Sequence, residues 1–84
     1  MRIKVKRKHI RRGVRNSDEC CPVALAIYQA TGIADVSVIE DQAWIEDYVV
    51  KLPKKVNRFI DRFDGGKSRR KMKPFSFKFK FKKS

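Results

Sequence analysis

Residues 75–82 alternate without interruption between phenylalanine and a serine or lysine. A strand places successive side chains on opposite faces of a sheet, so this alternation predicts a strand whose phenylalanines share one face. The opposite face carries lysines, whose unpaired charges would be prohibitively costly in a core. We therefore expect Phe75, Phe77 and Phe79 to be core residues rather than a base-stacking platform, with Phe81 close enough to the end to fray.

The other strands are predicted from shorter patterns in a chain of 84 residues, the length of one small domain with a single core. Residues 2–6 alternate between apolar and basic side chains, as a half-buried strand does. The pair Glu46-Asp47 separates two apolar runs and is placed to form a two-residue hairpin turn. Runs of β-branched and aromatic residues predict central strands at 36–39, 43–45 and 48–52.

Two helices are predicted between the outer strands. The first begins at Pro22 and ends at Gly32, and its apolar residues recur at the spacing of one helix face. The second begins near Pro53 and ends at residues 65–66, with the same periodicity. The prediction is one α+β domain spanning 1–84, in the order β-α-β-β-β-α-β, with a mixed or antiparallel sheet and both helices on one face. This order is similar to that of ferredoxin-like sheets, in which the end strands pair.

Charge is divided into blocks along the chain, which has 22 lysines and arginines, nine acidic residues and a net charge of +13. Residues 1–15 carry +8, residues 16–50 carry −7 without a lysine or arginine, and residues 51–84 carry +12. Charges that serve only solubility are normally interspersed. The blocks predict a polar molecule with a basic loop at 67–73, and residues 82–84 are expected to form a frayed tail.

Paired end strands would place a ladder of cations on one surface. Like charges at cross-strand spacing repel and cost stability, so a ladder without a folding role indicates an anionic partner. A clustered basic face is typical of proteins that bind nucleic acid. The candidate binding residues belong to the end strands, the second helix and the basic loop: Arg2, Lys4, Lys6, Lys55, Arg58, Arg62, Lys67, Arg69, Arg70, Lys71, Lys78, Lys80 and Lys82.

No pattern predicts catalysis, a metal site or a cofactor. A disulfide between the adjacent Cys20 and Cys21 would be strained, and His9 adds a third ligand without the spacing of a structural zinc site. Cys21 is interpreted as a small buried residue at the entry to the first helix. The acidic residues around the hairpin lack the arrangement of a metal nuclease and are interpreted as solvated turns. We therefore expect a protein that is not an enzyme.

The sequence also gives expectations about location. The longest apolar run, residues 23–27, is far shorter than the ~20 residues of a membrane-spanning helix. The basic N-terminal stretch is not followed by the apolar segment of a secretion signal. Two adjacent cysteines suit a reducing compartment. We expect a cytoplasmic protein without a membrane partner, located in the host cell if a phage encodes it.

Several short motifs together cover most of the chain: IRRG at 10–13, CPVALAI at 21–27, FIDRFDxG at 59–66 and PFSF at 74–77. With these motifs the chain resembles a family of small uncharacterised proteins carried by bacteriophages and mobile elements. The resemblance implies a phage setting and a βα sandwich, and it supplies no catalytic residues. The chain departs from the family in being more basic, notably at residues 78–83.

Two functional hypotheses follow. The first is a non-enzymatic protein that binds nucleic acid or a nucleoprotein, with low sequence specificity because phosphate contacts carry no base information. The alternative is an anti-defence inhibitor, for instance of the anti-CRISPR type, that acts by protein contact or sequesters an anionic nucleotide signal. Its candidate contact residues are Trp44, Glu40 and Asp41, although Trp44 could equally cover the core. DNA or RNA as ligand, a ribosomal or packaging role, and the oligomeric state stay open.

Overall fold

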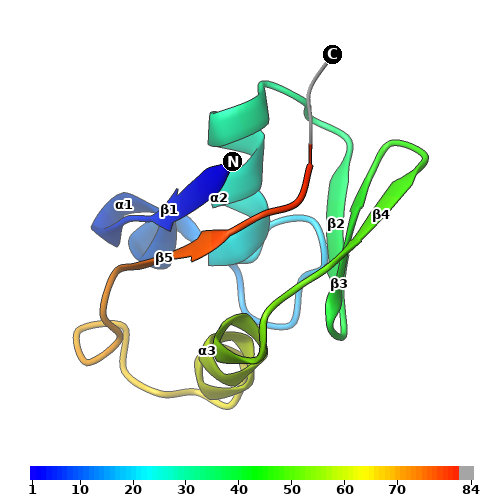
Figure 1. Cartoon of the computed structure of the whole chain (residues 1–84). Helices are drawn as coiled ribbons and strands as arrows, with labels where there is room; N and C mark the ends of the chain where they lie inside the picture. Colours follow the sequence, from blue (N-terminus) through cyan, green and yellow to red (C-terminus); the bar gives the residue numbers. More distant parts are fainter. Residues whose placement is uncertain (82–84) are drawn as a thin grey trace.

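The computed structural model describes residues 1–81, which form three helices and five strands (Figure 1). The predicted α+β class and the order of the predicted elements are confirmed, and one additional short helix follows the first strand. No helix in this part of the chain has the length and apolar character needed to cross a membrane. The elements are β1 Arg2–Val5, α1 Arg7–Arg12, α2 Pro22–Thr31, β2 Val36–Ile39, β3 Gln42–Ile45, β4 Tyr48–Lys51, α3 Lys54–Asp64 and β5 Phe75–Lys78.

Helix α1 has a sequence that does not favour a helix by itself. It is six residues long, RKHIRR, and so short and basic a helix is marginal in water. Tertiary packing and capping stabilise it. Ile10 is fully buried in the core, and the Nδ1 atom of His9 accepts a hydrogen bond of 2.8 Å from the backbone N–H of Lys6. Neither contact produces a repeating apolar pattern, so the sequence did not predict this helix.

Helix α2 begins and ends where its capping residues predict. The Sγ atom of Cys21 accepts a hydrogen bond of 3.4 Å from the N–H of Ala24, and Pro22 is the first helical residue. Gly32 follows the helix with a φ of 74°, a left-handed conformation that glycine adopts at little cost. The predicted boundaries are confirmed, as is the structural interpretation of Cys21.

Helix α3 is amphipathic. Val56, Phe59 and Phe63 recur at helical spacing and are buried. Its predicted start after Pro53 and its end before Gly65 are confirmed. The opposite side of the helix is exposed and basic, so α3 presents cations to solvent while its aromatic side chains pack on the core.

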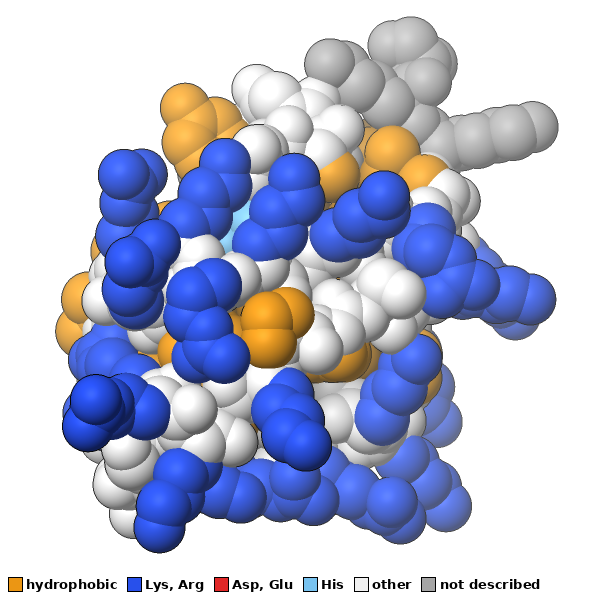
Figure 2. Space-filling view, turned by 90° about the vertical axis from the view of Figure 1, so that its left-hand side faces the viewer, with side chains coloured by type: hydrophobic (Ala, Val, Ile, Leu, Met, Phe, Trp, Pro, Cys, Tyr) orange, Lys and Arg blue, Asp and Glu red, His pale blue; other side chains and the backbone are white. Residues whose placement is uncertain are grey.

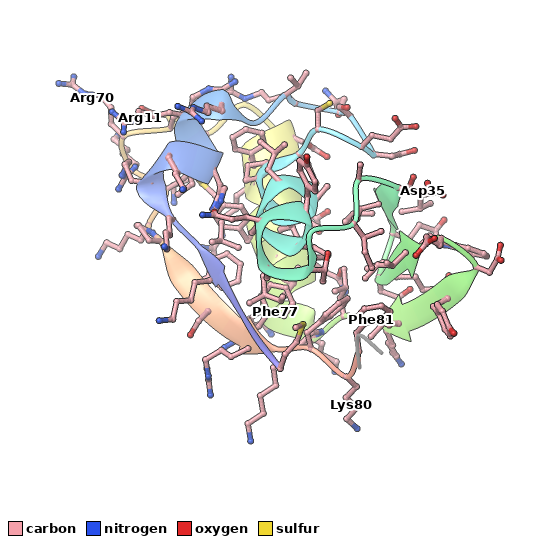
Figure 3. All side chains as sticks on the ribbon, turned by 90° about the horizontal axis from the view of Figure 1, so that it is seen from above. Arg11, Asp35, Arg70, Phe77, Lys80 and Phe81 are labelled. Carbon is pink, nitrogen blue, oxygen red and sulfur yellow. The ribbon has the colours of Figure 1, made fainter. Side chains whose placement is uncertain are left out.

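The strands are divided between two antiparallel sheets, so the prediction of a single sheet with both helices on one face is wrong in that detail. β1 pairs with β5, so that Ile3 lies opposite Phe77 and Val5 lies opposite Phe75. β2, β3 and β4 form a meander, with the predicted two-residue turn at 46–47. Figures 1 and 3 show α2 between this meander on one side and α1 with β1 on the other. The buried faces of all these elements meet in one continuous core.

The alternating phenylalanines contribute much of that core. Phe77 and Phe79 are buried, and their ring centroids lie 6.1 Å apart in an edge-to-face arrangement. The strand ends at Lys78, earlier than the alternation predicts, although the backbone of Phe79 still exchanges two hydrogen bonds with Met1. The expectation that Phe81 frays is wrong: it is 8% exposed, and its ring packs against a tyrosine of β4.

Candidate nucleic-acid interface

The fold separates the acidic and basic blocks of the sequence in space. In Figure 2, lysines and arginines cover the face that lies at the left of Figure 1, and no aspartate or glutamate is visible on it. Figure 3 shows Arg11 and Arg70 at one side of the molecule and Asp35, beside the meander, at the other. The basic face therefore includes α1, β1, β5 and the loop before β5, and through the pocket described below it continues onto α3.

The predicted ladder on the β1–β5 sheet is present in part. Arg2 lies directly opposite Lys78. Lys4 lies opposite Ser76, whose hydroxyl oxygen accepts a hydrogen bond of 3.1 Å from Nη1 of Arg2. The cations therefore flank a neutral position instead of facing one another at every step, which lowers the repulsion between the strands.

Two further predicted cations, Lys6 and Lys80, lie beyond this ladder. Lys6 is the residue that precedes α1, and Lys80 follows the end of β5. Because β5 ends at Lys78, Lys80 does not continue the row of lysines on one face of a strand. Lys78 and Lys80 instead border a hollow of about 540 Å³ beside the end of β4. Lys82 and the expected frayed tail at 82–84 lie outside the described residues.

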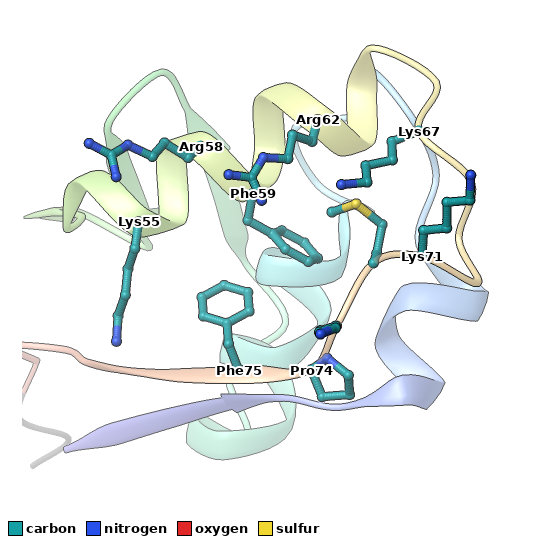
Figure 4. A pocket seen from close by; sticks show the side chains of 10 residues that line it. Lys55, Arg58, Phe59, Arg62, Lys67, Lys71, Pro74 and Phe75 are labelled. Carbon is teal, nitrogen blue, oxygen red and sulfur yellow. The ribbon is translucent and has the colours of Figure 1, made fainter.

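A concave basic site lies between α3 and the segment that leads into β5 (Figure 4). We name it the α3 pocket. It has a volume of about 460 Å³, within the range of small-ligand sites, and no acidic residue lines it. Its cations come from two segments that the sequence does not show to be adjacent: Lys55, Arg58, Arg62, Lys67, Lys71 and Lys73.

Five of these six cations are among the predicted binding residues, and Lys73 is not. Lys55, Arg58 and Arg62 share one side of α3 because they are three and four residues apart. Like charges at this spacing destabilise a helix by roughly 0.2–0.5 kcal/mol per pair, so a bound anion would stabilise α3. Arg70, also a predicted binding residue, is exposed and does not line the pocket.

The loop that completes the α3 pocket is held in place by Arg69. Its Nη1 atom donates hydrogen bonds to the carbonyl oxygens of Ile10 (2.8 Å), Arg11 (3.1 Å) and Gly13 (2.6 Å) at the end of α1. Its guanidinium carbon also lies 5.0 Å from the centroid of the Phe63 ring. The sequence predicts Arg69 as a binding residue, whereas these contacts give it a structural role.

Two arginines outside the predicted set support the same loop. Arg15 donates hydrogen bonds of 2.9 Å from Nε to the carbonyl of Phe63 and from Nη2 to the carbonyl of Lys67. Arg7 donates a hydrogen bond of 2.8 Å from Nη1 to the carbonyl of Arg69. Their partners are backbone atoms at least 48 residues away, so no local sequence pattern could have revealed them.

The floor of the α3 pocket is apolar. The rings of Phe59 and Phe75 point toward one another, with centroids 4.7 Å apart (Figure 4). Phe59 and Met72 are buried, whereas Phe75 is half-buried and leaves part of its ring open to the pocket. The prediction that Phe75 is a core residue is correct only in part, because this side chain belongs both to the core and to the pocket.

The acidic end of the molecule presents a different surface. Trp44 is 41% exposed and lies beside Val49 on the outer face of the meander, so it does not cover the core. Val49 and Ile39 are also exposed. Glu40 and Asp41 form the turn between β2 and β3, next to this apolar surface. The predicted contact residues are therefore accessible to a partner.

Cys21 and His9 are buried and have structural roles, whereas Cys20 is exposed. Burial raises the pKa of the Cys21 thiol, which disfavours a nucleophilic thiolate. Burial lowers the pKa of His9, whose Nε2 atom is 2.6 Å from Oε1 of Gln29. Among residues 1–81, no group of three or more His, Cys, Asp or Glu side chains is arranged to hold a metal ion.

Comparison of the chain with protein-family models, with curated proteins and with solved structures finds no match. The functional argument therefore rests on the structure itself: on the basic face, on the α3 pocket and on the exposed outer face of the meander.

Proposed function

We propose that this chain is a non-enzymatic protein that binds nucleic acid, or a nucleoprotein, through its basic face. One observation carries the proposal: cations from α3 and from the loop before β5 line a concave site that has no acidic residue. Arg2, Lys4 and Lys78 on the β1–β5 sheet extend the same charge. Like charge concentrated in this way costs folding free energy, and a polyanion offsets that cost.

The ligand groups that fit these side chains are phosphates. The guanidinium groups of Arg58 and Arg62 suit bidentate contacts with phosphate oxygens, and Lys67 and Lys71 act as point charges. Neutralised phosphates release condensed counterions, so affinity falls as salt rises. For about five phosphate contacts, log K should fall with log salt at a slope near −3.5 on single strands and −4.5 on duplex DNA. Sequence preference should be weak.

Fluorescence anisotropy with labelled oligonucleotides of mixed sequence, between about 50 and 200 mM salt, tests this proposal. The triple variant Lys55→Ala, Arg58→Ala, Arg62→Ala should weaken binding for all sequences and reduce the magnitude of the slope by about two to three. If the parent does not bind in low salt, or if this variant keeps the parent's affinity and slope, the proposal is wrong.

A matched control changes three charges at the opposite side of the molecule. The variant Asp35→Asn, Glu40→Gln, Asp41→Asn does not touch the α3 pocket and raises the net charge by three units, whereas the variant in the α3 pocket lowers it by three units. It should not weaken binding, because these carboxylates repel phosphate. If net charge alone governs affinity, this variant should strengthen binding about as much as the variant in the α3 pocket weakens it, whereas a local contact at the pocket predicts a much smaller gain.

A second candidate function is protein contact through the outer face of the meander. The observation that favours it is the exposed apolar surface of Trp44 and Val49 beside acidic turns. Such a surface suits a partner that is apolar at its centre and basic around it. In the phage setting that the sequence resemblance implies, the partner would be a host defence protein.

Capture from host lysate, with and without nuclease, distinguishes the two functions. A complex that survives nuclease and is lost in Trp44→Ala supports protein contact. A complex that nuclease abolishes supports nucleic-acid binding. We propose the cytoplasm as the location of either function, since two adjacent cysteines with no other cysteine in the chain suit a reducing compartment.

A further inference from the structure

The α3 pocket differs from the flat part of the basic face in its aromatic floor. A site for phosphate alone needs charges and hydrogen-bond donors. Here Phe59 and Phe75 meet beneath the cations, and part of the Phe75 ring is open to the pocket. A concave site with an apolar floor and a cationic rim matches a ligand that combines a flat apolar group with an anionic group.

A nucleotide is such a ligand, but only when its base is unpaired. In a duplex the bases are stacked inside the helix, and reaching one requires a few kcal/mol of unstacking and unpairing. We propose that the α3 pocket holds an unpaired nucleotide, with the base against Phe75 and the phosphates between Arg62 of α3 and Lys67 of the loop. The inference deepens the proposed binding of nucleic acid and rests on it.

The floor of the pocket is fixed before a ligand arrives. Phe59 stacks on Phe63, with ring centroids 6.3 Å apart and planes 7° apart. The loop opposite is tied to α1 through Arg69. A preformed site loses little conformational entropy on binding, so stacking on Phe75 contributes to affinity with little offset.

The same chemistry has two sources, a nucleotide within a single strand and a free nucleotide. Anisotropy with a labelled single-stranded oligonucleotide and with a duplex of the same length tests the first. Competition against the single-stranded probe by adenosine monophosphate and by inorganic phosphate tests the second. We expect tighter binding of the single strand than of the duplex, and stronger competition by the nucleotide than by phosphate.

The variant Phe75→Leu keeps an apolar side chain but removes the ring. It should weaken single-strand binding about fivefold or more and leave duplex binding unchanged, because stacking on an aromatic side chain accounts for that factor per base. Phe75→Tyr keeps the ring and should keep the parent's affinity. Phe81→Leu alters the same alternating segment away from the pocket, so it controls for a loss of stability and should not weaken binding.

The outcomes separate this inference from the proposed function. If the protein binds single strands and duplexes equally, with the expected salt dependence and no effect of Phe75→Leu, the inference is overturned and nucleic-acid binding stands. The inference also fails if inorganic phosphate competes as well as adenosine monophosphate does. This measurement uses the parent protein alone, so it does not depend on whether a variant folds. If neither oligonucleotide binds, isothermal titration calorimetry with adenosine monophosphate replaces the competition. Binding of this nucleotide that is lost in Phe75→Leu then supports the pocket and rejects nucleic-acid binding.

Discussion

Replacing Arg69 by lysine should destabilise the protein although the charge is unchanged. Its Nη1 atom donates to the carbonyls of Ile10, Arg11 and Gly13 at 2.8, 3.1 and 2.6 Å. One such nitrogen has two hydrogens, so the contacts are equivalent to about two full hydrogen bonds. Hydrogen bonds to charged groups contribute about 1.5–3 kcal/mol each, and water replaces part of that where the site is exposed.

A lysine ammonium lacks the planar fork and would retain about one of these contacts. The change also removes the guanidinium that lies 5.0 Å from the Phe63 ring, an interaction worth about 0.5–1 kcal/mol. The expected loss is therefore about 2–3 kcal/mol of unfolding free energy. In a domain of this size, that corresponds to a fall in Tm of about 10–20 °C.

Urea and thermal unfolding, followed by circular dichroism, measure both quantities. Arg70→Lys is the matched control, because Arg70 is the exposed neighbour of Arg69, and it should alter the unfolding free energy by no more than about 0.5 kcal/mol. If Arg69→Lys has the same Tm and unfolding free energy as Arg70→Lys, the reasoning is refuted. Solvent would then replace the guanidinium at no cost, and the loop of the α3 pocket would not depend on Arg69.

Three other changes test the fold. Gly13→Ala should lower the unfolding free energy in urea by about 1–3 kcal/mol, because a Cβ atom there would lie 2.5 Å from ring carbons of Pro22. Phe77→Ala should lower it by about 3–5 kcal/mol, and a parent-like melt would instead assign the phenylalanines to a binding surface. Burial lowers the pKa of His9 from 6.5, so the unfolded chain binds the proton more readily. His9 should therefore contribute stability above pH 6.5 that is lost as the pH falls, and thermal melts should show a smaller loss in His9→Gln.

Local sequence patterns predict an element when its apolar residues recur at the spacing at which a strand or a helix turns side chains toward the core. The alternation that begins at Phe75 and the helical repeat that follows Pro22 are of this kind, because each buried side of the element coincides with its apolar residues. The strand nevertheless ends at Lys78. Beyond it the N–H of Phe81 bonds to the carbonyl of Phe79, a local turn that keeps the alternate rings buried without a strand.

The candidate site is predictable to a similar extent. Arg58 and Arg62 follow from the basic side of an amphipathic helix, and their place in the α3 pocket agrees with that pattern. The pocket itself was not predicted, because it depends on how the loop with Lys67 and Lys73 packs against α3. The structural role of Arg69 was missed for the same reason, since its acceptors are backbone atoms of α1.

The net charge overstates the number of cations available to a ligand, because several arginines already donate hydrogen bonds to backbone carbonyls. Arg7, Arg15 and Arg69 join the basic N-terminal block to the basic loop through carbonyl acceptors rather than through carboxylates. A guanidinium suits this work, because its planar fork can serve several carbonyls at once. These bonds satisfy donors but do not neutralise charge, so the two blocks still repel each other where they meet. An anion held by Lys67 and Lys71 would relieve that repulsion at the same loop, which links ligand binding to the stability of the fold.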